Sequence, residues 1–371
     1  MAVASDKDAQ QAARKPRRTQ AENLVLIRMA WPWVFLILLV VAFTISSKQL
    51  NNVNFLSSRA IQGILVYTTQ ILLIGLAETF VIISGGIDLS LGWTLGFASV
   101  VAAMVMKALA PTTAPPIVVI GAGALAGLLV TIVPGLINGV LIARVKVPSF
   151  IATLGVGILV EGAALLLSKG YPIADQPSYL GRLGNGSLIN WNPGHWFTFF
   201  KVPPSAVQAD LQHNIPLMPN IVFVTIIVTA VCWFILAKTQ FGQHLYAIGG
   251  NFEAAVRAGI PVRRTLIKVY ILASLLAGVA GILWAARFTS GAYNGGETTT
   301  LTAIAAVVIG GASLYGGEGR IVGTIVGALI IATIQYGLVV LGVLPFWQYI
   351  AVGIVLIIAV VVEQFGRGLG K

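Results

Sequence analysis

Long apolar stretches alternate with short polar ones along nearly the whole chain. A helix needs about 20 apolar residues to cross a bilayer, and about ten stretches approach that length. They lie at residues 31–47, 60–84, 89–107, 117–143, 150–168, 217–237, 266–286, 299–314, 321–342 and 345–362. The pattern predicts an all-α polytopic membrane protein with about ten transmembrane helices. Some of them should be broken, because Gly85-Gly86-Ile87-Asp88 interrupts the apolar run.

The amino-acid composition supports the membrane assignment. Hydrophobic residues make up 57% of the chain, charged residues make up 9%, and the mean hydropathy is +0.91. Soluble domains carry about 25% charged residues. The net charge of +11 does not indicate a nucleic-acid partner, because the basic residues are spread among the ends of apolar stretches. Cys232 is the single cysteine, so no intrachain disulfide is expected.

The basic residues orient the chain, since Lys and Arg are enriched on the cytoplasmic side of membrane proteins. An even number of helices places both termini on one side, and a cytoplasmic assignment of the termini puts most Lys and Arg there. The other side keeps a smaller set: Lys48, Arg59, Lys107, Lys169, Arg182, Lys201 and Arg287. We therefore expect a cytoplasmic basic tail at residues 1–30, a transmembrane domain at 31–365 and a cytoplasmic tail at 366–371.

Two polar segments interrupt the apolar pattern. Residues 170–216 form a long external loop rich in Pro, Gly, Asn and aromatic residues, which either docks an external partner or lines the headgroup region. Residues 238–265 form a cytoplasmic loop with a basic island, YAIGGNFEAAVRAGIPVRRTLI, from Tyr246 to Ile267. A pore, channel or membrane enzyme has no evident need for such an island, whereas a membrane subunit that binds a soluble motor does.

The sequence offers no clear catalytic or metal-binding pattern. The three histidines, His195, His213 and His244, fall in loops at spacings unsuited to a metal ion. The chain has no G-x-x-x-x-G-K-[ST] loop, and the Gly-rich stretch GGASLYGGEGR from Gly310 lacks the lysine that would reach a nucleotide phosphate. We expect no catalytic residue, metal or cofactor on this chain, so another polypeptide must handle any ATP.

Three carboxylates lie in or near apolar stretches, where an ionised group costs about 2.5–3.5 kcal/mol. Glu78 is either a pathway residue or a protonated or hydrogen-bonded structural carboxyl. Asp88 follows Gly86-Ile87, and we expect it to accept bonds from the amides of a restarting helix. Glu161 is the third carboxylate.

A short internal repeat accompanies the break at Gly85. VIISGGIDLSLG from Val81 and VVIGGASLYGG from Val307 each place a Gly-Gly pair after a β-branched run and before a helix rich in small residues. Duplicated broken helices around a central path are common in transporters. The repeat therefore supports a transport function.

Four motifs in sequence order carry a family resemblance. They are IISGGIDLSLG from Ile82, GLINGVLIARVKVPSFIATLG from Gly135, IGGNFEAAVRAGI from Ile248 and AIAAVVIGGASLYGGEGRIVGTIVGALI from Ala303. Together they resemble the permease subunits of bacterial ABC importers of the ribose, xylose and galactose class. The similarity runs from about Asn54 to Glu363.

The resemblance implies a subunit of the bacterial inner membrane that pairs with a second permease copy or a homologous permease. Such a subunit receives a monosaccharide from an external sugar-binding protein. It opens alternately as cytoplasmic ATPase subunits, which hold ATP and Mg, close and separate. The segment from Gly249 to Ile260 then corresponds to the coupling helix, with these expected ATPase-coupling residues: Gly249, Gly250, Asn251, Glu253, Ala254, Ala255, Arg257 and Gly259.

Each coupling residue has an expected role. Asn251 caps the helix and Glu253 lies in its first turn. Ala254 and Ala255 form a compact face for a narrow groove, and Arg257 pairs with acidic groups of the ATPase. The glycines at both ends are expected to act as hinges.

This chain departs from the family pattern where the resemblance would carry substrate contacts. Members commonly have an arginine where this chain has Glu161, a Glu-Leu-Asp where it has Thr300-Leu301-Thr302, and an Asn-Asn-Gly where it has Gln335-Tyr336-Gly337. Either a sugar or a related polyol therefore fits the resemblance. The polar candidates for the substrate path are Glu78, Asn138, Thr153, Gln335 and Tyr336.

The sequence thus predicts a permease without enzymatic activity of its own. The alternative from another class is a secondary transporter driven by an ion gradient, with Glu78 as the proton carrier. A membrane enzyme is a more distant alternative.

Overall fold

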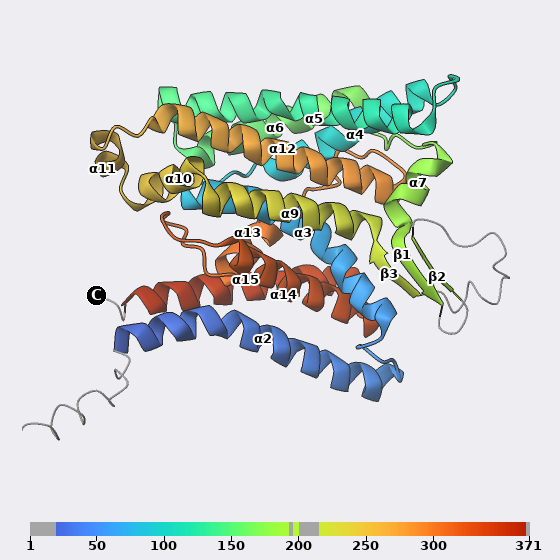
Figure 1. Cartoon of the computed structure of the whole chain (residues 1–371), viewed down its shortest axis with the longest axis horizontal. Coiled ribbons are helices and arrows are strands. Elements are labelled where there is room, and N and C mark those ends of the chain that lie inside the picture. The colour runs from blue at the N-terminus through green and yellow to red at the C-terminus, as the bar shows by residue number, and fades with distance from the viewer. Residues whose placement is uncertain (1–19, 193–195, 200–214, 369–371) are drawn as a thin grey trace, which may run out of the picture.

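The computed structural model describes residues 20–192, 196–199 and 215–368. Its helices lie side by side, with α10 and α11 at one end of the molecule and a small β-sheet at the other (Figure 1). We call these the α11 end and the sheet end. Most of the predicted basic tail, His195, His213 and part of the predicted external loop lie outside the described residues.

The first half of the chain consists of these elements: α2 (Gln20–Asn51), α3 (Ser58–Ile83), α4 (Leu91–Leu109), α5 (Pro116–Val140), a π-helical turn η1 (Leu141–Val145), α6 (Ser149–Ser168) and α7 (Ser178–Asn185). A sheet follows, formed by β1 (Ser187–Asn192), β2 (Trp196–Phe199) and β3 (Ile215–Pro219). The second half contains α9 (Asn220–Lys238), α10 (Gln240–Gly250), α11 (Phe252–Arg257), α12 (Val262–Phe288), α13 (Thr299–Ile309), α14 (Ile321–Val340) and α15 (Pro345–Gly368).

The described residues contain 8 helices that are long and apolar enough to cross a membrane. All ten predicted stretches fall on helices, which confirms the polytopic all-α class. One of them is shorter than predicted, because α13 has only 11 residues. Helix α15, with 24 residues, covers the whole of its predicted stretch. The predicted break is confirmed, because α3 ends at Ile83 and α4 begins at Leu91.

Burial separates a central group of helices from a peripheral one. In the most apolar stretch of α3, 83% of the residues are buried, against 11% in α2. Helices α4, α12 and α14 resemble α3, whereas only 22%, 33% and 28% of the residues are buried in the most apolar stretches of α5, α6 and α9. Large exposed apolar faces on parallel helices are suited to contact with lipid. The core is therefore built around α3, which packs against α12, α13 and α14.

Local sequence explains how the central helices start and join. Ser57 caps α3 by accepting a hydrogen bond from the Ala60 amide at 3.3 Å. Within the core, the Thr79 and Thr324 hydroxyls meet at 2.6 Å and join α3 to α14. Such hydroxyl contacts are a common way to link helices inside a membrane.

The sheet end contains more regular structure than the predicted loop. Strand β1 pairs antiparallel with both β2 and β3, with Asn190 opposite Thr198 and Trp191 opposite Ile215. The described part of the predicted external loop, residues 170–216, thus contains α7 and strand segments. Alternating aromatic and polar residues in β1 and β2 are a strand signal that the all-α interpretation did not use.

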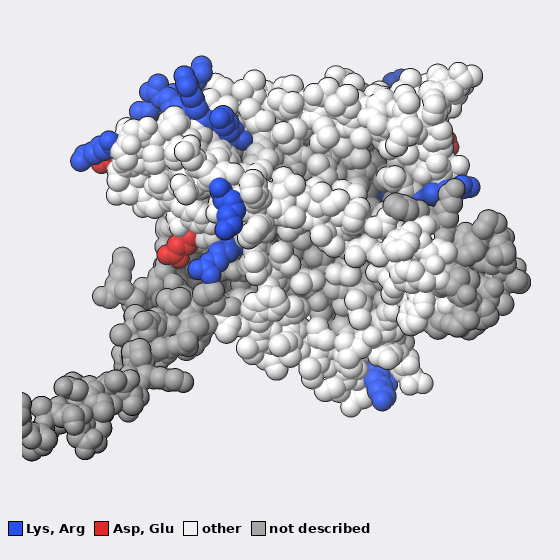
Figure 2. Space-filling view, viewed as in Figure 1, with Lys and Arg blue, Asp and Glu red and all other residues white. Residues whose placement is uncertain are grey.

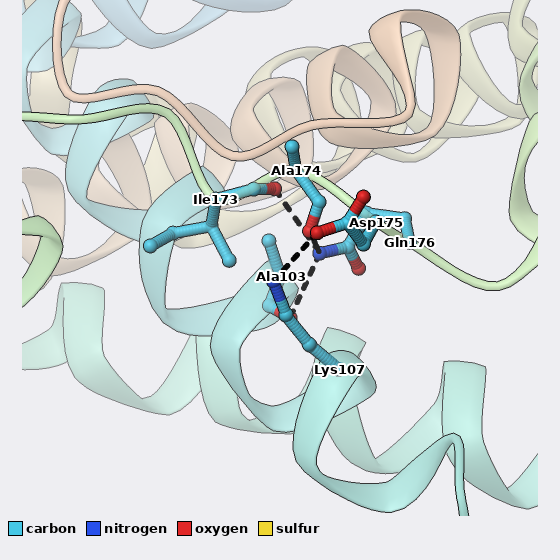
Figure 3. Close-up of polar contacts among 6 residues, drawn as sticks. All are labelled: Ala103, Lys107, Ile173, Ala174, Asp175 and Gln176. Carbon is cyan, nitrogen blue, oxygen red and sulfur yellow. Dashed lines mark hydrogen bonds and ion pairs between the residues drawn. The ribbon is translucent and has the colours of Figure 1, made fainter.

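The segment between α6 and α7 is tied to the end of α4 (Figure 3). The Lys107 ammonium and the Asp175 carboxylate form an ion pair at 3.1 Å. The Gln176 side chain donates to the Ala103 carbonyl at 3.2 Å and to the Ile173 carbonyl at 3.1 Å. These contacts hold the chain against α4 at the sheet end.

Candidate functional site

The coupling segment predicted from the sequence forms α10 and α11 at one end of the bundle (Figure 1). Asn251 caps α11, as predicted, since its Oδ1 accepts a hydrogen bond from the Ala254 amide at 2.9 Å. Glu253 lies in the first turn and pairs with Arg257 at 3.8 Å. Both of these charged side chains are 83% exposed, so the pair contributes little to stability.

The two faces of α11 differ from the prediction. The Ala255 side chain is buried in a small cluster with Ala143, Ile248, Val262 and Leu266. Of the predicted compact pair, Ala254 alone is exposed. The sequence interpretation missed Phe252 and Val256, which are 54% and 52% exposed. Their spacing of four residues places them on one side of the helix, so α11 presents an apolar strip beside its charges.

Gly249 serves for close packing more than as a hinge. A Cβ added there would overlap the Ile83 carbonyl oxygen and approach the Gly317 amide nitrogen. The same Gly317 amide donates to the Ile83 carbonyl at 2.9 Å. Gly250, by contrast, has open space around its Cβ position. The end of α10 therefore presses directly on the end of α3 and on the loop after α13, at a contact that we call the glycine seam.

Two further contacts fix this region. The Tyr246 hydroxyl donates to the Gly319 carbonyl at 2.7 Å, and burial raises the pKa of Tyr246, which keeps the hydroxyl protonated as a donor. Gly259 has a φ of +77° just after α11, and the following Ile260 amide donates back to the Ala255 carbonyl at 3.1 Å. Gly259 thus terminates the helix in the manner of a C-terminal cap.

The internal repeat noted in the sequence corresponds to two matching helix ends. At the end of α3, Gly85 has a φ of +87°, and the Gly86 amide donates to the Val81 carbonyl at 3.1 Å. At the end of α13, Gly311 has a φ of +90°, and the next amide donates to the Val307 carbonyl at 3.1 Å. Both helices end in the same glycine-dependent cap, and both ends lie near the coupling segment.

The break after α3 is held by a buried polar cluster. Asp88 Oδ1 accepts from the Ser90 amide at 2.9 Å and from the Ser90 hydroxyl at 2.5 Å. This confirms that Asp88 accepts a bond from an amide where the helix restarts. The Asn138 side chain donates to the Ser90 hydroxyl at 2.9 Å. Thr153 accepts from the Leu89 amide at 3.1 Å, so α5 and α6 both clamp the break.

Glu78 borders the same cluster. Its Oε2 lies 3.5 Å from the Asp88 amide, which is a weak bond at best. Glu78, Asp88, Asn138 and Thr153 are all fully buried. Among the described residues, Glu78 Oε1, Asp88 Oδ2 and Asn138 Oδ1 have no hydrogen-bond partner. Three of the five predicted path residues therefore gather in a closed interior.

The other two predicted path residues lie elsewhere. Gln335 and Tyr336 are half-buried in α14. The Tyr336 ring contacts Tyr67 with centroids 5.7 Å apart, and the Arg287 guanidinium lies 5.3 Å from the Tyr67 centroid. Tyr67 precedes Glu78 by about three helical turns, or roughly 16 Å. The predicted path residues thus form two separate groups.

Neither of the two best-formed hollows in the described part of the chain suits a polar solute. The larger has a volume of about 470 Å³ and lies between α3, α9 and α14, lined by side chains such as Leu72, Trp233 and Ile325. The smaller, of about 180 Å³, lies between α2 and α3. A site for a polar molecule needs placed hydrogen-bonding groups, and these apolar walls match hydrocarbon better.

Charge is unevenly distributed over the surface. Basic side chains gather at the α11 end (Figure 2), where the exposed ones include Arg144, Lys146, Lys238, Arg257, Arg263, Arg264, Lys268 and Arg320. A basic end of this kind is typical of the cytoplasmic side of a membrane protein.

Comparison with known proteins assigns a family. Residues 60–360 match the family described as branched-chain amino acid transport system / permease component. The chain is 36% identical over 338 residues to the ribose import permease protein RbsC of Bacillus subtilis (strain 168), covering 90% of this chain and 92% of the relative.

Two further relatives have similar coverage. The L-arabinose ABC transporter permease protein AraH of Azospirillum brasilense is 35% identical over 357 residues, which is 96% of this chain and 93% of the relative. The fructose import permease protein FrcC of Rhizobium meliloti is 32% identical over 339 residues, which is 91% of this chain and 86% of the relative. No solved structure matches the chain significantly.

Proposed function

The chain belongs to the branched-chain amino acid transport system / permease component family, and from that premise we propose that it is the membrane subunit of an ATP-driven importer of a monosaccharide or related polyol. It is a multi-pass protein of the bacterial inner membrane and a transport subunit. The sugar assignment follows the relatives, whose names specify ribose, L-arabinose and fructose import.

The observation that carries the proposal is the exposed α11, seated on the glycine seam at the basic end of the molecule. We place this end in the cytoplasm, together with both termini. A separate ATPase that binds Mg and ATP docks on α11 through Phe252, Val256 and Arg257. Apolar anchors beside an arginine are the residue types that dominate protein interfaces.

The glycine seam supplies the route from this docking site to the core. A displacement of α10 acts on the Ile83 carbonyl and the Gly317 amide together, because Gly249 touches both. The ends of α3 and α13 then move as one unit. A second copy of the chain forms the opposite wall of the path, and an external binding protein delivers the solute at the sheet end.

The test is transport by the complete importer in sealed vesicles. The chain is co-expressed with its ATPase, and external binding protein is added with ribose, arabinose, fructose or leucine. We expect ATP-dependent uptake of a sugar and no uptake of leucine. Reversing both charges of the Glu253 and Arg257 pair should leave the complex folded while it uncouples ATP hydrolysis from uptake.

One alternative has a specific observation in its favour. Glu78 is a fully buried carboxyl without an ion-pair partner among the described residues, as expected of a proton carrier in a secondary transporter. That alternative predicts uptake in vesicles that lack nucleotide and carry a pH gradient. The importer proposal predicts no uptake under those conditions.

A further inference from the structure

The segment between α12 and α13, residues 290–298, folds back into the bundle beside α4. The Ser99 hydroxyl donates to the Ala292 carbonyl at 3.0 Å and accepts from the Ala292 amide at 3.1 Å. A Cβ on Gly96 would overlap the Tyr293 carbonyl oxygen, and one on Gly92 would overlap the Gly296 carbonyl oxygen. The segment therefore follows α4 from its middle to its first turn.

These contacts place the segment deep between the ends of the spanning helices. Gly281 of α12 meets the Leu95 carbonyl of α4, about two turns before α12 ends at Phe288. Gly92 lies about one turn deeper, so Gly296 is roughly 15 Å from the sheet end of α12. Backbone that is not helical is tolerated at such depth where it is buried in protein or lines water, and it does not face lipid.

One side of the segment is exposed at the surface of the single chain. Asn294, Glu297 and Thr298 are exposed there, and Leu301 in the first turn of α13 is 56% exposed. An ionised carboxylate against acyl chains costs about 2.5–3.5 kcal/mol even on the lenient insertion scale. A polar surface at this depth must therefore face water or another protein.

The chemistry of the exposed groups matches a polyhydroxylated solute. A carboxylate accepts hydrogen bonds from hydroxyl groups, whereas an amide both donates and accepts them. Helix α13 begins at Thr299, immediately after these residues. First-turn amides of a helix favour electronegative oxygen atoms, such as those of a sugar; here the Thr299 amide already donates to the Gly296 carbonyl at 2.9 Å.

We propose that Asn294, Glu297 and Thr298 contact the transported solute, in a water-filled path whose opposite wall is a second copy of this chain. The inference deepens the proposed import function and rests on it for the class of solute. Under this proposal, the polar residues that line the path belong to the segment before α13, and the sealed cluster around Glu78 does not line it.

Thiol accessibility tests whether the segment faces water, independently of transport. Asn294→Cys is introduced into a Cys232→Ala chain, since Cys232 is the single cysteine. The importer in membranes is then treated with a charged methanethiosulfonate reagent. The matched control is Leu129→Cys on α5, which is 54% exposed and lies at similar depth, because the nearby Thr131 hydroxyl oxygen is 3.0 Å from a Cβ on Gly278.

We expect the Asn294→Cys variant to react at least about tenfold faster than the Leu129→Cys control, because the thiolate that reacts forms in water and not in hydrocarbon. Equal, slow reaction at both positions would overturn the inference. Either result leaves the proposed import function untouched.

Uptake by the complete importer tests solute contact. Glu297→Gln and Asn294→Ala should each raise the KM for sugar by about tenfold, since each removes a hydrogen bond to the solute. The control is Gly155→Ala on α6, where an added Cβ meets nothing within 4 Å, which should leave KM unchanged. If wild-type chain imports no sugar, the proposed function fails. If wild-type chain imports sugar and the Glu297 and Asn294 variants match its KM, this inference alone fails.

Discussion

The chain breaks twice inside the bundle, and the two breaks have opposite surroundings. The first, residues 84–90, is sealed by α3, α5 and α6, with Asp88 and Ser90 fully buried. The second, residues 290–298, exposes Asn294 and Glu297 at the surface of the chain. The first break adjoins the glycine seam, whereas the second adjoins α4 and, through the bridge between Gly291 and Ile173, the segment between α6 and α7. The contrast between a sealed and an exposed break fits our proposal that the first transmits force and the second contacts the solute.

The largest effect is expected from a substitution that displaces residues 290–298, the second break, from the surface of α4. Gly96→Val places side-chain atoms where the Tyr293 carbonyl lies, so we expect destabilisation of about 3 kcal/mol or more. Thermal melting in detergent measures it. Gly155→Val is the control, because a Cβ on Gly155 meets nothing within 4 Å. Equal melting temperatures would show that the segment does not lie against α4.

The link between the first break and the coupling segment is tested at Gly249. Gly249→Ala forces α10 away from the Ile83 carbonyl, so sugar uptake by the importer should fall more than about tenfold while ATP hydrolysis continues. The neighbouring Gly250→Ala variant has open space at the added Cβ and should transport normally. A Gly249→Ala variant that transports at the wild-type rate would refute the seam as the coupling route.

A paired substitution compares the two breaks directly. Asn138→Ala leaves the buried Ser90 hydroxyl without its donor, and we expect a loss of about 1–3 kcal/mol in stability. Asn294→Ala changes an exposed side chain and should alter stability by less than about 0.5 kcal/mol. Melting temperatures of the two variants check this. Similar losses at both positions would contradict the distinction between a sealed and an open break.

A smaller loss of stability than that of Asn138→Ala is expected where the two breaks touch. The Gly92 amide donates to the Thr300 hydroxyl at 2.7 Å, which joins the start of α4 to the start of α13. Thr300→Val removes this acceptor and should cost about 1 kcal/mol, measured by thermal melting. Thr300→Ser keeps the hydroxyl and should retain most of the stability. If Thr300→Ser and Thr300→Val lose equal stability, the loss is due to side-chain packing and not to the hydrogen bond.

Local features were predictable from the sequence. Apolar length located the helices, the Gly85-Gly86 pair located the first break, and Asn251 was recognised as the cap of α11. Each of these depends on residues close together in the chain. The repeat near Val307 was also recognised, and its meaning as a matching helix end became clear from the hydrogen bonds.

Features that depend on distant residues were not predictable. The stretch around Asn294 reads as an ordinary loop, because its depth is set by Gly92 and Gly96 of α4. Gln335 and Glu78 were grouped as path residues, although the fold separates them. The burial of Ala255 depends on a cluster drawn from η1, α10 and α12, which single-helix periodicity does not reveal.

The glycine seam also has a kinetic consequence. Where Gly249, Gly85 and Gly316 meet, backbone touches backbone, so the seam itself requires no change of rotamer when α10 shifts against α3. The Phe80 ring of α3 and the Phe241 ring of α10, with centroids 6.4 Å apart, form a side-chain contact beside it. Interdigitated side chains normally impose such steps on a moving interface. We therefore expect the seam itself to offer little resistance to sliding, and the slow step of a conformational cycle to lie where side chains interlock, as at the Thr79 and Thr324 contact between α3 and α14.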